Sequence, residues 1–230
     1  MKPEEMREFA VKHVPLLYFD KREPFPVVGI GYTVFEESGK SHSSPKSIEL
    51  GKRGRNLCIE YAVFFDYDIQ HLYDLEHIWV YLDSDGKAVD CEASFHGMYM
   101  NVWNTGIDLF RGTDAVHLYS QPGKHAMMPH PNLFGLHWEE AECCMETAGK
   151  DGILNPGILE GYPVFDEADC ENAKRYIKEN YGFRPANHYV MMKNREEILI
   201  PWEKLEEWIP GRIAAELEKI RCWAKMNETE

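Results

Sequence analysis

Four side chains that suit a divalent cation stand close together in the sequence: Asp68, His71, Asp74 and Glu76. They lie within the most apolar part of the chain, residues 64–82. A carboxylate placed in such a segment is costly to bury unless a cation or hydrogen bonds compensate its charge. Three carboxylates and one imidazole suit a hard or borderline ion, so we expect Mg²⁺, Ca²⁺ or Mn²⁺ ahead of Zn²⁺, whose sites more often contain two or three histidines.

The same spacing also has a purely structural interpretation. Asp74 and Glu76 could flank the solvent-exposed end of a strand while His71 caps a loop. Short patterns of this kind often arise by chance, and the spacing alone leaves both interpretations open.

A strand expected over residues 71–82 would position these groups. Because side chains alternate between the two faces of a strand, Asp74 and Glu76 share one face with the aliphatic residues that follow them. His77 lies on the opposite face and is expected to be a core or cross-strand residue. Asp85-Gly86 then predicts a tight hairpin over residues 83–87, so a strand over residues 88–95 should pair antiparallel with the first.

The remaining pattern predicts a mainly β, α+β fold. Strands dominate the first two-thirds of the chain and helices the last third, which favours an antiparallel β-sandwich or twisted sheet with peripheral helices. We expect a single domain over residues 1–230, with a β core at about 14–130 and a helical part at about 137–225. Further strands are expected over 14–19, 27–35, 57–65 and 115–120, and helices over 3–13, 137–147, 169–181 and 201–224, the last broken at Pro210-Gly211.

Charge and composition exclude some partners. The formal net charge of −14 argues against nucleic acid, since phosphate backbones need basic patches. The basic residues Lys46, Lys52, Arg53 and Arg55 are expected to be a solvated loop. No run approaches the ~20 apolar residues of a membrane helix, and no export signal is evident. The six cysteines are therefore read as reduced thiols of a cytoplasmic protein.

The run from Gln70 to Glu76, Gln-His-Leu-Tyr-Asp-Leu-Glu, resembles the Gly-His-Arg-His-Asp-Trp-Glu heptapeptide of the necrosis- and ethylene-inducing-like proteins and of a related vacuolar-sorting protein family. His71, Asp74 and Glu76 match residues that bind a divalent cation in that family. The resemblance implies a further Asp ligand, here Asp68 with Asp66 as the alternative. Residues 94–99 and 123–126 resemble two more family segments.

The chain also departs from that family. Gln70, Leu72, Tyr73 and Leu75 replace four residues of the heptapeptide, and the loop before His71 is much shorter. Cytolytic members of the family are secreted and disulfide-bonded, so toxin activity is not expected of this chain.

His96 and His125 are the candidate catalytic residues, because a histidine beside a metal can act as a general base or steady a developing charge. Their structural alternative is a histidine satisfied by backbone carbonyls near a turn. Our leading hypothesis is a metal-binding protein that, if an enzyme, hydrolyses a polar ester, phosphoester or glycan-linked substrate. The alternative is a non-catalytic module that binds a carbohydrate or lipid headgroup, and a third hypothesis is an ion of purely structural role.

Overall fold

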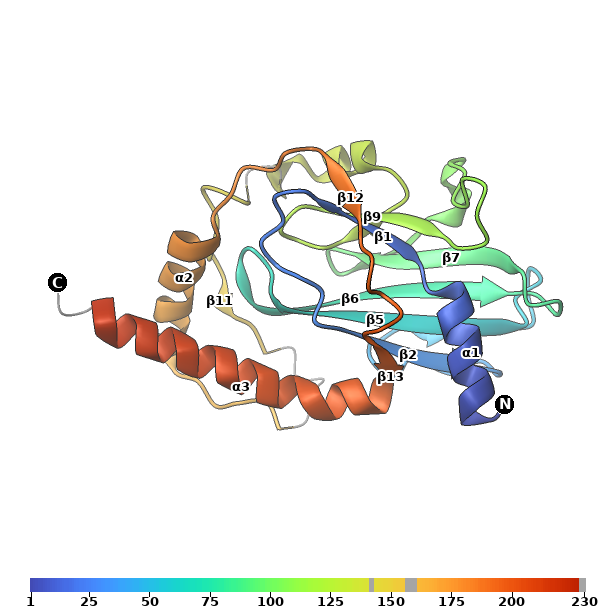
Figure 1. Cartoon of the computed structure of the whole chain (residues 1–230), viewed down its shortest axis with the longest axis horizontal. Coiled ribbons are helices and arrows are strands. Elements are labelled where there is room, and N and C mark those ends of the chain that lie inside the picture. The colour runs from blue at the N-terminus through green and yellow to red at the C-terminus, as the bar shows by residue number, and fades with distance from the viewer. Residues whose placement is uncertain (141–142, 156–160, 228–230) are drawn as a thin grey trace.

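The computed structural model describes residues 1–140, 143–155 and 161–227, and for residues 136–140 the backbone alone. Two sheets share one core, and the two longest helices lie in the C-terminal third, which confirms the predicted α+β class (Figure 1). The strands are β1 (Leu16–Asp20), β2 (Gly29–Phe35), β3 (Gly39–Lys40), β4 (Ser47–Ile48), β5 (Leu57–Tyr67), β6 (His71–Leu82), β7 (Ala88–Phe95), β8 (Met98–Asn101), β9 (His117–Ser120), β10 (Met127–Met128), β11 (Gly152–Ile153), β12 (Tyr189–Met191) and β13 (Leu199–Pro201). The helices are α1 (Pro3–His13), α2 (Glu167–Tyr181), α3 (Trp202–Asn227) and the 3-10 helices η1 (Trp103–Thr105) and η2 (Pro131–Glu140).

The larger sheet has the strand order β13-β2-β5-β6-β7-β8, with β11 beside the start of β6. The smaller sheet has the order β10-β9-β1-β12, and β3 and β4 form a separate ribbon. Most neighbouring strands are antiparallel, as expected, but β1–β9, β2–β13 and β6–β11 are parallel pairs. Parallel neighbours need long connections, and these three bring distant parts of the chain together.

The predicted strand at the centre of the molecule is observed with its predicted bounds. β6 pairs antiparallel with β7 through the hairpin at residues 83–87, and Ile78 lies opposite Ala93. Its two faces also separate as expected. Ile78 packs in the main core, whereas Trp79 and Tyr81 belong to a smaller core on the other side of the sheet.

Two helix predictions were wrong. In place of a helix over residues 137–147, η2 ends at Glu140, residues 143–150 form turns, and residues 141–142 lie outside the described part. The expected break at Pro210-Gly211 is absent, because α3 continues through Pro210. Proline removes one helical hydrogen bond, and the burial of Ile209 and Ile213 on the face that packs on the core compensates for that loss.

The strand expected over residues 88–95 is followed by a second hairpin that was not predicted. β7 turns at His96-Gly97 and returns as β8. Both turn residues have positive φ, 49° at His96 and 75° at Gly97. This conformation suits the two-residue turns that join antiparallel strands, so His96 lies at a hairpin tip.

The basic cluster is only partly the solvated loop that was expected. Arg55 is buried and pairs with Asp90 and Glu92, and Lys46 Nζ lies 2.8 Å from Glu92. Lys52 and Arg53 are exposed. The six cysteines are free thiols, and no helix in the described ranges is long and apolar enough to cross a membrane.

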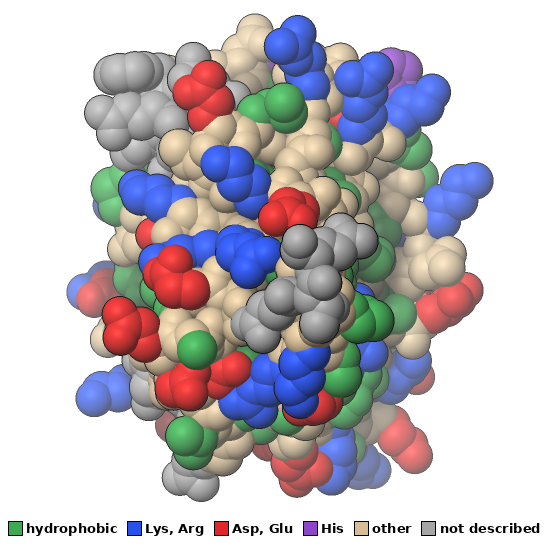
Figure 2. All heavy atoms as spheres, turned by 90° about the vertical axis from the view of Figure 1, so that its left-hand side faces the viewer, with side chains coloured by type: hydrophobic (Ala, Val, Ile, Leu, Met, Phe, Trp, Pro, Cys, Tyr) green, Lys and Arg blue, Asp and Glu red, His purple; other side chains and the backbone are tan. Residues whose placement is uncertain are grey.

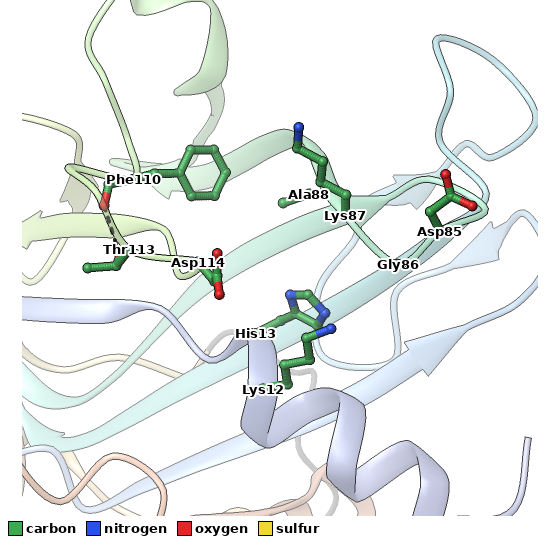
Figure 3. Close-up of a pocket in the computed structure, with 9 residues that line it drawn as sticks. All are labelled: Lys12, His13, Asp85, Gly86, Lys87, Ala88, Phe110, Thr113 and Asp114. Carbon is green, nitrogen blue, oxygen red and sulfur yellow. Dashed lines mark hydrogen bonds between the residues drawn. The ribbon is translucent and has the colours of Figure 1, made fainter.

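His13 ends α1 at the wall of a cavity of about 310 Å³, between Lys12 and Asp114 (Figure 3). The side chain is 4% exposed, and its Nε2 has no hydrogen-bond partner in the described structure. Burial, aided by Lys12, lowers the pKa of His13 to about 4, against a smaller opposing effect of Asp114. The imidazole is therefore neutral at pH 7.

This buried imidazole should make stability depend on pH. In the unfolded chain a histidine has a pKa near 6.5, so below about pH 6.5 the unfolded state binds more protons than the fold. Lowering the pH from 7 to about 4.5 should cost about 2 kcal/mol at His13. In His13→Phe, the free energy of unfolding measured with urea should therefore fall by about 2 kcal/mol less over this range than in the unmodified protein. The exposed control His188→Phe should follow the unmodified protein, and identical pH profiles for the two variants would contradict this assignment.

Candidate functional site

The predicted acidic cluster lies where β5 ends and β6 begins. Asp68 occupies the turn between the two strands and is 1% exposed. Its Oδ1 accepts hydrogen bonds from the backbone N–H groups of Gln70 (2.6 Å) and His71 (2.7 Å). Aspartate commonly stabilises a turn in this way, so Asp68 fixes the point at which β6 starts.

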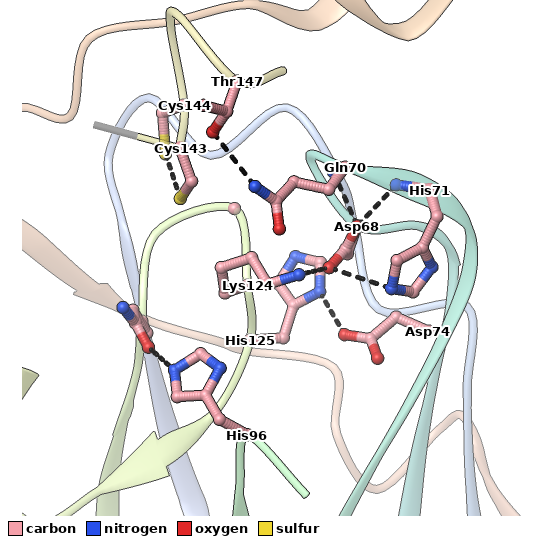
Figure 4. A network of polar contacts seen from close by, with 12 residues as sticks. Asp68, Gln70, His71, Asp74, His96, Lys124, His125, Cys143, Cys144 and Thr147 are labelled. Atoms are coloured by element: carbon pink, nitrogen blue, oxygen red, sulfur yellow. Dashed lines mark hydrogen bonds and ion pairs between the residues drawn. The ribbon is translucent and has the colours of Figure 1, made fainter. Parts of the chain in front are cut away.

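Lys124 neutralises this buried carboxylate. Its Nζ contacts Asp68 Oδ2, and His71 Nε2 lies 3.3 Å from the same oxygen (Figure 4). Burial alone would raise the pKa of Asp68, but His71 and Lys124 outweigh it and lower that pKa. Burial would lower the pKa of Lys124, and Asp68 raises it above its ordinary value instead. Asp68 and Lys124 therefore form a charged pair.

His125 lies between two further carboxylates. Its Nδ1 donates to Asp74 Oδ2 at 2.9 Å, and its Nε2 lies 3.5 Å from Glu23 Oε1. The ring is fully buried and stacks on Phe65 with the ring centres 3.7 Å apart. Burial lowers the pKa of His125, but Asp74 and Glu23 raise it to about 10 overall. His125 is therefore an imidazolium at neutral pH. We call Glu23, Asp68, Asp74, Lys124 and His125 the buried charge network.

The loop that carries Lys124 and His125 is held rigidly. Gly123 has a φ of 70°, and a Cβ there would lie 2.9 Å from Ile69 and 3.0 Å from Cys144 Sγ, so only glycine fits. Its N–H donates to Glu23 Oε2 at 2.7 Å, and its carbonyl accepts from Ile69 N at 2.7 Å. His125 also has a positive φ of 58°, a conformation that surrounding contacts must compensate.

Glu76 lies beside the buried charge network and accepts a hydrogen bond from the Ser94 hydroxyl. Burial and the neighbouring Asp74 raise the pKa of Glu76 to about 8, despite that hydrogen bond. His77, on the opposite face, is buried and its Nε2 lies 3.1 Å from the Ser43 carbonyl oxygen, as expected of a core histidine. The alternative acid, Asp66, pairs with Arg212 and takes no part in the network.

His96 lies apart from the buried charge network and points away from Asp74 (Figure 4). Its Nε2 donates to Gln121 Oε1 at 2.6 Å, since a carbonyl oxygen can only accept. Of the two predicted catalytic histidines, His125 is thus in the network and His96 contacts the first residue of the loop that carries it.

The structure fits the predicted metal ion poorly. A cation that the family resemblance implies would compensate Asp68, yet the Lys124 ammonium already contacts this carboxylate. Asp74 is engaged by His125 and Glu76 by Ser94. Across residues 1–140, 143–155 and 161–227, no group of three or more His, Cys, Asp or Glu side chains is placed to hold a metal ion. The ligand set Asp68, His71, Asp74 and Glu76 therefore stays a prediction.

A cavity of about 420 Å³ borders the same loop. Gln121 and Pro122, which precede Gly123, form one wall. Hydrogen-bonding side chains of Arg184 and Asn187 and the ring of Phe134 line the remainder, together with Cys144 and two further prolines. Cavities of this size accommodate small ligands.

Sequence reasoning missed three residues that complete the site. The sequence predicts only turns at residues 23–26 and 121–124, which assigns no role in the site to Glu23, Gln121 or Lys124. Glu23 and Lys124 lie far from Asp68 and Asp74 in sequence, so no local pattern connects them. A local signal did exist at Lys124, because a lysine next to a histidine in an apolar stretch needs a partner when buried.

Comparison with known proteins gives a distant likeness in fold. Two solved structures of NLPPya, in complex with glucosamine and with mannosamine, are 19% and 18% identical to this chain, each covering 55% of it and 67% of that chain, with a TM-score of 0.37. A structure described as "Toxin fold as basis for microbial attack and plant defense" is 20% identical over 52% of this chain and 66% of that chain, with a TM-score of 0.35. No family model and no curated protein matches the sequence. The resemblance to the necrosis- and ethylene-inducing-like proteins is therefore confirmed as a distant one, and it carries no conclusion about ligands or activity.

Removing the Lys124 ammonium should destabilise the fold strongly. Lys124→Gln would leave Asp68 buried without a countercharge, and breaking such a pair costs about 3–5 kcal/mol. The free energy of unfolding from urea titration measures this loss. The control Lys204→Gln removes an exposed ion pair with Glu207 and should cost less than about 1 kcal/mol. Equal losses in both variants would contradict the role of Lys124.

The predicted metal site has a separate test. Elemental analysis of the purified protein measures bound Mg²⁺, Ca²⁺, Mn²⁺ and Zn²⁺, and thermal unfolding with and without a chelator measures their effect. A stoichiometric ion that is lost in Glu76→Ala supports the predicted ligands. A protein free of metal and indifferent to chelator contradicts them.

Proposed function

We propose that this chain is a non-catalytic binding protein for a small polar ligand of the carbohydrate class. The ligand would lie in the cavity of about 420 Å³ beside Gln121. This cavity is the observation that carries the proposal, because it combines amide and guanidinium groups with an aromatic ring and prolines. Ligand sites typically pair such apolar walls with a few polar groups that fix orientation.

The polar groups of this cavity are well placed to hold hydroxyl groups. Asn187 and Arg184 are exposed and form one wall, and amide and guanidinium groups offer several donors each. Gln121 is 4% exposed and is oriented by its contact with His96. His96 thus acts here as a residue that positions Gln121.

The buried charge network supports binding over hydrolysis. His125 is fully buried, and its Nδ1 bonds to Asp74 while its ring stacks on Phe65. A general base must reach the proton that it removes, and this ring has no open path to a substrate. The network instead holds the loop at residues 121–125 in place, which favours a preformed cavity. Glucosamine and mannosamine are ligands of NLPPya, and a sugar panel is the direct test for this chain.

Binding of monosaccharides should be weak and should depend on the cavity residues. We expect dissociation constants of roughly 1 mM, typical of about 4 kcal/mol of binding free energy. Asn187→Ala removes a hydrogen-bonding side chain and should weaken binding by about three- to tenfold. The measurement is NMR titration with glucose, glucosamine, mannose and N-acetylglucosamine, and phosphocholine serves as a lipid-headgroup probe.

The control Asn56→Ala changes an exposed asparagine just before β5 and should bind as the unmodified protein does. The proposal fails if no saccharide binds, or if Asn187→Ala and Asn56→Ala bind equally well. Binding of phosphocholine alone would replace the carbohydrate class with a lipid headgroup.

A further inference from the structure

A third cavity, of about 330 Å³, lies between α2 and the segment of residues 146–150. Its walls contain one acidic side chain, Glu146, and four basic ones: Lys150, Lys174, Arg175 and Lys178. The whole chain has a formal net charge of −14, so this cavity reverses the sign of its surroundings. Figure 2 shows several Lys and Arg side chains on this face of the molecule, interspersed with acidic side chains.

The basic groups come from both walls of the cavity. Lys178 lies four residues after Lys174 and three after Arg175 on α2, so it is a neighbour of both on the helix surface. Lys150 comes from the segment that packs against that helix. A small anion in the cavity would therefore meet positive charge from two sides.

Gly149 allows the two walls of the cavity to pack closely. Its φ is 76°, and a Cβ at this position would lie 2.1 Å from the carbonyl oxygen of Lys174, so the segment approaches α2 as closely as a glycine permits. Its N–H also donates to the Ile69 carbonyl at 2.8 Å. The backbone that carries the basic residues is therefore held in place before any ligand binds.

Two of the four basic side chains of this cavity are uncompensated in the described part of the chain. Lys174 pairs with Glu171 at 2.6 Å, and Arg175 lies over the Trp223 ring at 5.4 Å. Lys150 and Lys178 are exposed and make no side-chain ion pair with any other described residue. A lysine in the last turn of a helix is stabilised by the helix dipole. This accounts for the position of Lys178, but not for those of Arg175 and Lys150.

We propose that this cavity binds a phosphate group, carried by a small phosphate ester or by a lipid headgroup. A phosphate monoester has nearly two negative charges and three acceptor oxygens, which matches several cations converging from two walls. Lysine and arginine are the usual partners of phosphate. Thr147 adds a hydroxyl whose oxygen accepts from Gln70 Nε2 at 3.0 Å, which leaves its proton to donate. This proposal does not depend on the carbohydrate cavity beside Gln121.

The test compares two double variants with the same change in charge. Lys150→Glu with Lys178→Glu reverses the two unpaired cations of the cavity. Lys193→Glu with Lys204→Glu reverses two exposed lysines elsewhere. Isothermal titration calorimetry with glucose 6-phosphate, at about 50 mM salt to limit screening, should show tighter binding to the unmodified protein than glucose gives. Affinity should fall about tenfold or more in the cavity variant and less than about twofold in the control.

Vesicles distinguish the two sources of phosphate. Co-sedimentation is measured with phosphatidylcholine vesicles that contain or lack phosphatidic acid. Retention by phosphatidic acid vesicles without binding of glucose 6-phosphate assigns the site to a lipid headgroup, and the reverse assigns it to a soluble ester. Binding of neither probe overturns the proposal. Equal losses in the two double variants also overturn it, because they would indicate general charge attraction.

Discussion

The ion pair of Asp68 and Lys124 links the two sheets of this protein. Asp68 belongs to the turn between β5 and β6 in the larger sheet, and Lys124 to the connection between β9 and β10 in the smaller one. Both charges are largely removed from water, so neither is tolerable without the other. The pairing of His125 with Asp74 makes a second link between the same two segments. Because these links are short-ranged and directional, the connection between β9 and β10 can occupy one position only.

The sum of charges in the buried charge network explains its proton affinities. Three carboxylates, Glu23, Asp68 and Asp74, face two cations, Lys124 and His125. The excess of negative charge raises the pKa of His125 to about 10, although burial opposes protonation. The same excess, with burial, makes a further charge unfavourable at Glu76, whose pKa is about 8. A histidine held in this way serves structure, since its charge is needed to keep neighbouring carboxylates buried.

Sequence reasoning succeeded where a local pattern carried the information. The alternation in β6 and the Asp-Gly turn after it determine the bounds, pairing and two faces of that strand, and all were predicted. The position of the acidic cluster at the start of β6 was also predicted. The group that compensates its charge was not predicted, because Lys124 is 56 positions from Asp68 in the sequence and only the sheet topology brings the two together. A buried acid needs a cation, and sequence alone does not say whether a metal or a lysine supplies it.

Local rules also failed where packing opposed them. Pro210 predicts a helix break, yet α3 buries Ile209 and Ile213 on the core and stays continuous. The strands β11, β12 and β13 are too short to show a periodic pattern, and they exist because a neighbouring strand offers free hydrogen-bonding groups. The His96-Gly97 turn carried a usable signal, since glycine next to a residue that tolerates positive φ is typical of a hairpin.

The two cavities proposed to bind ligands share one structural element, the segment of residues 143–153. Cys144 lines the cavity beside Gln121, and Lys150 lines the basic cavity. A ligand in one cavity alters affinity in the other only if it shifts an element common to both. Cys144 packs against Gly123 of the 121–125 loop, and Gly149 packs against α2. Neither glycine leaves room for an added Cβ atom. The segment is therefore clamped at both ends, and the two sites should bind their ligands independently.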